Sequence, residues 1–127
     1  MSVTFTAATR TFCPEFDADM LVSVPEAEEL EVNMSNSNAA VVCGSLGIDL
    51  EEWGWCGGLP AEDFLGRVLV ALAIQPSDEG IPSHEVPTGG ARWIECGRRP
   101  GYIQERLAQL HELAAWAVEH GAEIDFG

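Results

Sequence analysis

Three asparagines stand within six residues, and their amides are the first candidates for chemistry in this chain. Asn33, Asn36 and Asn38 alternate with Met34, Ser35 and Ser37 just before an alanine- and valine-rich stretch that is compatible with a helix. Side-chain amides and free backbone N–H groups at a helix start can hold an anion or a polar ligand. The same residue types also cap helices and close turns. The segment therefore has two interpretations, a ligand site and a helix cap with more amides than one cap requires.

A second candidate is the pair Arg98 and Arg99, which precedes a predicted helix beginning at Tyr102. Cations are unfavourable at this end of a helix, because the helix dipole is positive there. Such a pair could grip a carboxylate or a phosphate through two parallel hydrogen bonds, and Arg106 lies one turn further on. The alternative is that both arginines pair with the chain's own 21 acids. If there is a small-ligand site, we expect it between the asparagine segment and the arginine pair, with Tyr102 beside it.

The cysteines and histidines are too widely spaced to predict a metal site, because structural zinc usually draws its ligands as closely spaced pairs. No two of the four cysteines form a CxxC pair. Cys56 lies in a glycine-rich loop with Trp53 and Trp55, where the pKa of a thiol could be lowered. No family-specific motif surrounds it and no histidine is placed as its base. We predict no catalytic residue, no metal and no cofactor, and we expect the two tryptophans to close the core edge or form a contact surface.

Net charge is the strongest compositional signal. The chain carries 21 acids against six arginines and no lysine, for a net charge of −15. This balance disfavours direct binding to nucleic acid, which needs clusters of basic side chains, and binding to an anionic membrane. Two interpretations of the acidity remain open. The acids could mimic nucleic-acid phosphates in a partner's basic cleft, or they could form a solvated surface that keeps the protein soluble.

Alternation of side chains predicts strands in the first third of the chain. Residues 3–12 alternate with threonine and phenylalanine enrichment, and shorter strands are expected at 20–24 and 30–34 within an otherwise irregular acidic stretch. A short helix should follow the asparagine segment and end near Leu46, with Gly47 just beyond it. Residues 49–58 are expected to form a loop.

The rest of the chain contains its clearest helix. A helix from Pro60, in its first turn, to Ile74 is apolar all round in its later part and is expected to be buried centrally. Residues 75–91 are expected to form a long, mobile surface loop, followed by a strand over 91–96. From Tyr102 to His120 the spacing of apolar residues is typical of an amphipathic helix. Gly121 should end it, and 123–126 should form a strand.

These elements predict one α+β domain spanning residues 1–127, with about three helices packed on a small, mostly antiparallel sheet. Length supports one domain, since it lies near the common domain size. The N-terminus lacks a charged region followed by an apolar region, and no apolar run reaches the roughly 18 residues of a membrane span. We therefore expect a cytoplasmic protein.

Three stretches, residues 33–39, 58–64 and 96–102, resemble segments of small uncharacterised proteins from high-GC actinobacteria and their phages. The similarity covers about residues 30–127. It implies a bacterial or phage cytosolic setting and brings no function with it.

The first functional hypothesis is a non-enzymatic accessory factor that binds another protein, because the chain is acidic, holds four tryptophans and lacks a catalytic constellation. The second is a small-anion-binding domain or enzyme that uses residues 33–38 with Arg98 and Arg99. The third is a nucleic-acid mimic, a special case of the first. Oligomeric state is left open by the sequence.

Overall fold

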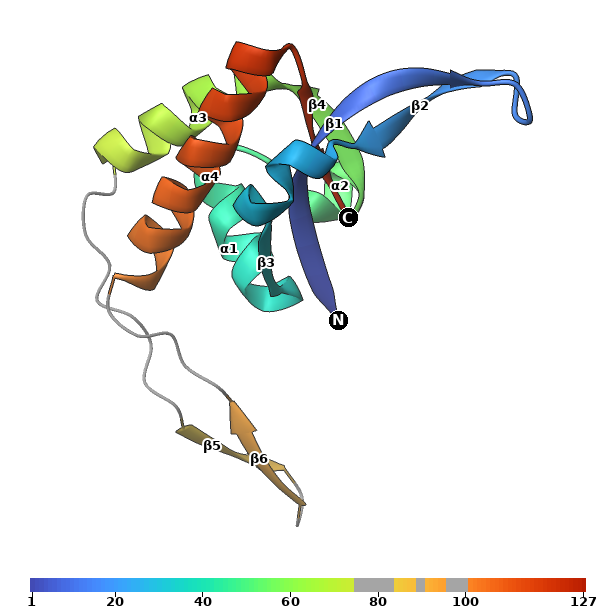
Figure 1. Ribbon diagram of the computed structural model, residues 1–127. Helices are drawn as coiled ribbons and strands as arrows, with labels where there is room; N and C mark the ends of the chain where they lie inside the picture. The colour runs from blue at the N-terminus through green and yellow to red at the C-terminus, as the bar shows by residue number, and fades with distance from the viewer. Residues whose placement is uncertain (75–83, 89–90, 96–100) are drawn as a thin grey trace.

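A computed structural model describes residues 1–74, 84–88, 91–95 and 101–127 (Figure 1). It confirms the α+β class, with three main helices packed against a five-stranded sheet in which every pairing is antiparallel. The strands of this sheet are β1 (Ser2–Cys13), β2 (Ala18–Ser23), β3 (Val32–Ser35), β4 (Gly57–Pro60) and β7 (Glu123–Phe126).

The long strand β1 organises the sheet. Phe5 pairs with Val32 of β3 and with Phe126 of β7, so these two strands lie on opposite edges of β1. Ala8 likewise pairs with β2 on one side and with β7 on the other. It follows that β2 and β3 lie one after the other along the same edge, and the strand order is β2-β1-β7-β4.

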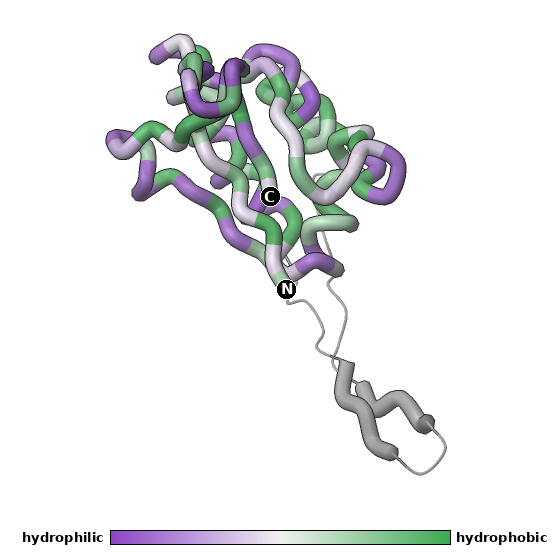
Figure 2. Tube along the Cα trace, turned by 90° about the vertical axis from the view of Figure 1, so that its right-hand side faces the viewer, coloured by the Kyte–Doolittle hydropathy of each residue, from purple (hydrophilic) through white to green (hydrophobic). Residues whose placement is uncertain are grey.

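One face of the sheet forms the core. Val3, Phe5 and Ala7 of β1 are buried, as the predicted alternation requires, and hydrophobic and hydrophilic stretches alternate along the chain in Figure 2. The Phe5 ring centroid lies 6.0 Å from that of Phe64 and 6.0 Å from that of Phe126. Because these rings come from strand, helix and C-terminal strand, a single cluster joins both ends of the chain.

The main helices are α1 (Asn36–Ser45), α3 (Ala61–Ile74) and α4 (Tyr102–His120). Helix α4 has the predicted bounds, and its apolar stripe is buried as expected; the stripe comprises Ile103, Leu107, Leu110, Ala114 and Ala117. Gly121 follows it with φ 67°, and β7 follows over the predicted residues. Helix α1 ends as predicted, with Gly47 at φ 73°.

Several predictions for the middle of the chain are wrong. Residues 49–58 are not a plain loop, because they contain helix α2 (Leu50–Trp53) and the start of β4, in which Pro60 is the last residue rather than the first of a helix. A 3₁₀ helix, η1 (Pro25–Leu30), occupies part of the stretch expected to be irregular.

Helix α3 has the predicted end but not the predicted burial. Phe64, Val68 and Ala71 face the core, whereas Leu69, Val70 and Ile74 are exposed. Exposed and buried residues alternate at helical spacing, so α3 packs along one side only and leaves an apolar outer side.

Strands β5 (His84–Thr88) and β6 (Ala91–Glu95) form a separate antiparallel pair. The strand over 91–96 is thereby confirmed over Ala91–Glu95, whereas the expected loop of 75–91 contains β5; its remaining residues, 75–83 and 89–90, lie outside the described residues. None of the helices within the described ranges is long and apolar enough to cross a membrane.

The distal half of the β1–β2 hairpin projects beyond the helices (Figure 1). Its apolar side chains are consequently exposed, among them Phe12, Phe16, Met20 and Val22. At its base the Arg10 guanidinium lies 2.8 Å from the Glu123 carboxylate, which ties β1 to β7.

Candidate functional site

The asparagine segment divides between three structural roles. Asn33 lies on β3, and its amide nitrogen donates to the hydroxyls of Ser2 (3.1 Å) and Thr4 (2.8 Å) on the neighbouring strand. Helix α1 is capped by Ser35, whose hydroxyl accepts from the backbone N–H of Asn38 at 3.3 Å. Asn36, the second of the predicted asparagines, lines an open cavity.

The arginine pair cannot be compared with this segment. Arg98 and Arg99 lie outside the described residues, so a site between them and the asparagines stays a prediction. Tyr102 begins α4, and the Arg106 guanidinium carbon lies 5.1 Å from the centroid of its ring. Tyr102 lines none of the described cavities.

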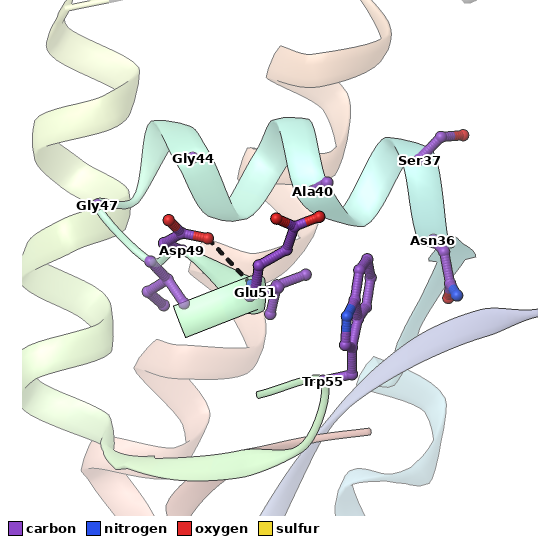
Figure 3. A pocket seen from close by; sticks show the side chains of 10 residues that line it. Asn36, Ser37, Ala40, Gly44, Gly47, Asp49, Glu51 and Trp55 are labelled. Atoms are coloured by element: carbon purple, nitrogen blue, oxygen red, sulfur yellow. Dashed lines mark hydrogen bonds between the residues drawn. The ribbon is translucent and has the colours of Figure 1, made fainter. Parts of the chain in front are cut away.

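The cavity at Asn36 is an open groove of about 640 Å³ between α1 and α2, which we call the Trp55 groove (Figure 3). Its wall on the α1 side is made of small and polar residues. Its opposite wall comes from the α1–α2 turn, from α2 and from Trp55, which lies two residues beyond the end of α2. The lining residues are Asn36, Ser37, Ala40, Gly44, Gly47, Ile48, Asp49, Leu50, Glu51 and Trp55.

Local rules of chain geometry set the α2 wall. The left-handed turn at Gly47 reverses the chain after α1, and the Asp49 carboxylate caps α2 by accepting from the backbone N–H of Glu51 at 3.0 Å. Leu50 is buried beneath α2, and Gly54, at φ 97°, ends that helix. These constraints leave Glu51 on the exposed side of the four-residue helix.

Trp55 forms the aromatic end of the groove. Trp55 is 41% exposed, and in Figure 3 the indole and the Glu51 carboxylate both point toward α1, with Asn36 beyond the indole. The sequence suggested a contact surface or a core plug for this tryptophan. Its exposure favours the contact surface, as does the 45% exposure of Trp53.

A second groove of about 680 Å³ adjoins the first and is lined by some of the same residues, Gly44 and Gly47. We call it the Arg67 groove; its remaining lining residues are Ser45, Leu46, Glu62, Asp63, Gly66, Arg67 and Val70. Together the two grooves form a continuous face over α1, α2 and α3 as far as Val70.

Arg67 is held in place by four groups of the chain itself. Its Nε lies 3.1 Å from an Asp63 carboxylate oxygen, and its Nη1 donates to the carbonyls of Leu46 (2.9 Å) and Gly47 (3.4 Å). Its guanidinium carbon lies 5.4 Å from the centroid of the Trp53 ring. An arginine fixed by a carboxylate and an indole face is the pattern expected of a cation–π contact supported by an ion pair.

The charges of the two grooves are not balanced. Asp49 and Glu51 line the first, and the residues that line it include no base. The second has Glu62 and Asp63 against Arg67 alone. An anion in the Trp55 groove would share it with two carboxylates, so this face favours cations.

Nucleophilic or metal chemistry finds no support at this face. Burial raises the pKa of the Cys43 thiol to about 11, which leaves it protonated at neutral pH. The exposed Cys56 does not line either groove. Within the described residues, no three potential metal ligands gather into a site.

Comparison with known protein families, with curated proteins and with solved structures finds no match to this chain.

Proposed function

We propose that this chain is a non-enzymatic binding protein that docks a basic segment of a partner protein on the face formed by the Trp55 and Arg67 grooves. The observation that carries the proposal is the continuity of two open grooves lined by four carboxylates, with an exposed indole at one end. Aromatic side chains are enriched in protein interfaces because they bury large areas at low entropic cost.

The apolar side of α3 extends the same face. Val70 lines the Arg67 groove and is 57% exposed, and Leu69 lies next to it along the helix. Exposed apolar patches bordered by charged residues are typical of interaction sites. A partner segment that carries both apolar and basic side chains would complement this surface.

Overall charge supports a basic partner. A net charge of −15 attracts cationic chains and repels acidic ones, which raises association rates with basic partners. The same charge disfavours a second copy of this chain as the occupant of so acidic a face.

Site-specific photo-crosslinking tests the docking face. A photoreactive amino acid is placed at Ala40, at Val70 or, as a control, at the exposed Asp19 of the β1–β2 hairpin, and each variant is introduced into the cells that make the protein. We expect the first two positions to capture the same basic segment, mapped by mass spectrometry. Excess unlabelled protein should compete, whereas the Gly44→Trp variant, which fills both grooves, should not. Equal capture from Asp19, or equal competition by Gly44→Trp, would contradict the proposal.

A further inference from the structure

We infer that the Trp55 groove is a receptor for a single arginine or lysine side chain of the partner, whose charged end lies against the Trp55 indole beside the Glu51 carboxylate, with the Asp49 carboxylate further along the same groove. The inference rests on the proposed function, because it names the group of the partner segment that this groove accepts.

The first support is the composition of the groove. It combines an exposed indole with two carboxylates, and its other side-chain donors and acceptors, Asn36 and Ser37, are neutral. A cation over an indole face is attracted by the ring's electron density, and nearby carboxylates add ion pairing. A neutral apolar ligand would leave Asp49 and Glu51 facing it without compensation.

The second support is the chain's own Arg67, which lines the adjoining groove. Arg67 contacts the same two kinds of group, the Trp53 indole and the Asp63 carboxylate, and these fix its guanidinium, although Trp53 itself is not part of that groove's lining. In the Trp55 groove the corresponding components are present, and no basic residue lines it. The two grooves share Gly44 and Gly47, so a partner's cation in the Trp55 groove would occupy the groove that adjoins the one lined by Arg67.

The third support is the shape of the α1 wall. Ala40 and Gly44 present almost no side chain to the groove, and a Cβ built on Gly44 would meet no heavy atom within 4 Å. A long, unbranched side chain can therefore lie along α1 with its charged end beside Glu51. Small residues at this wall keep the groove open for the stem of a lysine or an arginine, which packs well on apolar surface.

The test uses short blocked peptides as probes and nuclear magnetic resonance as the readout. Acetyl-Ala-Arg-Ala-amide is titrated into the full chain, and the same peptide with citrulline in place of arginine serves as the uncharged isostere. The Trp55 indole N–H signal is assigned by its loss in Trp55→Phe. We expect the arginine peptide to shift this signal and the citrulline peptide to bind about tenfold more weakly, since it loses the ion pairs and the cation–π contact.

Matched variants separate a defined site from general attraction. Glu51→Gln should weaken the arginine peptide about two- to fivefold, whereas Glu52→Gln, which removes the same charge from the next residue outside the groove, should change it by less than about twofold. Asp49→Asn removes a charge while keeping a residue able to cap α2, and it should also weaken binding about two- to fivefold. Trp55→Leu, which removes the indole face, should also weaken binding of the arginine peptide.

Three results would overturn the inference: equal binding of the citrulline peptide, equal effects of Glu51→Gln and Glu52→Gln, or a Trp55 shift with inorganic phosphate in place of the peptide. Failure here is distinguishable from failure of the docking face. Groove-dependent crosslinking at Ala40 and Val70 without arginine recognition would leave the proposed function standing and remove only the cation site.

Discussion

Gly66→Ala should stabilise the protein, and the structure sets the size of the gain. Gly66 lies in the interior of α3, on its exposed side, and a Cβ added there would meet no heavy atom within 4 Å. Glycine is about 0.8–1 kcal/mol less favourable than alanine inside a helix, largely because it loses more backbone freedom on folding. With no clash to subtract, we expect the free energy of unfolding to rise by about 0.5–1 kcal/mol, or the melting temperature by about 3 °C.

Gly47→Ala is the matched control, because the same chemical change meets the opposite geometry. Gly47 has φ 73°, and its added Cβ would lie 3.2 Å from the Arg67 Nη1 that donates to the Leu46 carbonyl. An alanine in this left-handed conformation costs about 1–2 kcal/mol. Urea unfolding followed by both tryptophan fluorescence and circular dichroism measures the two changes, and an unchanged denaturant dependence would show that the unfolded states are comparable.

A loss of stability in Gly66→Ala would refute the reasoning, since it would mean that the space beside α3 is filled in solution. The proposed docking face adds a second expectation. Gly66 lines the Arg67 groove, so the stabilising alanine should weaken capture of the partner from Val70. Opposite effects on stability and binding are typical of positions that serve function at a cost to the fold.

Three further predictions concern the core and the titrating groups. Leu110→Ala should lower the free energy of unfolding by about 2–5 kcal/mol, because Leu110 is fully buried in α4; a urea-measured loss below about 0.5 kcal/mol would contradict that packing. Native protein treated with iodoacetamide at mildly alkaline pH should be modified at the exposed Cys56 and not at the buried Cys43, whose pKa is raised to about 11; equal labelling rates by mass spectrometry would be evidence against this. Burial also raises the pKa of Asp125, so the folded state binds its proton more tightly and loses stability as pH rises through that pKa. Asp125→Asn should therefore raise the melting temperature at neutral pH but not near pH 3, where the carboxyl is neutral in both states, and equal gains at both pH values would disprove it.

The sequence predicted best the elements whose periodicity reports their own packing. Helix α4 and strand β7 have the expected bounds, because apolar spacing along each one records which side is buried. The burial of α3 was predicted wrongly for a related reason. Apolar composition shows that Leu69, Val70 and Ile74 could pack, but it does not show whether another element covers them, and none of the described elements does.

Short elements with distant partners could not be predicted. Strand β4 consists of two glycines, a leucine and a proline, and it exists because Gly57 and Leu59 pair with Phe126 and Ile124 from the far end of the chain. Helix α2 is fixed by its aspartate cap and by one buried leucine. Neither segment is long enough to show a period of its own.

The candidate site was predicted in part for the same physical reason. Asn36 was named from its residue type and its place before a helix. The carboxylates and the indole opposite it are 13–19 residues away in sequence and are brought there by the turn at Gly47. The two tryptophans were the sequence signal that pointed to this surface. In a glycine-rich stretch, two indoles have few neighbouring side chains that could bury them.

Three features that weaken a fold coincide on the docking face. Glycines stand in two helices at Gly44 and Gly66 where an alanine would fit, apolar side chains of α3 face solvent, and acids line both grooves of an already acidic protein. Each is unfavourable for folding alone, by helix propensity, by exposure of apolar area and by repulsion between like charges. A basic, partly apolar segment that binds here would cover the exposed apolar side chains and would neutralise the acids. It would also need the space that the two glycines leave open. The folding of this chain alone does not account for these three features, whereas the proposed partner binding would account for all of them at one place on the surface.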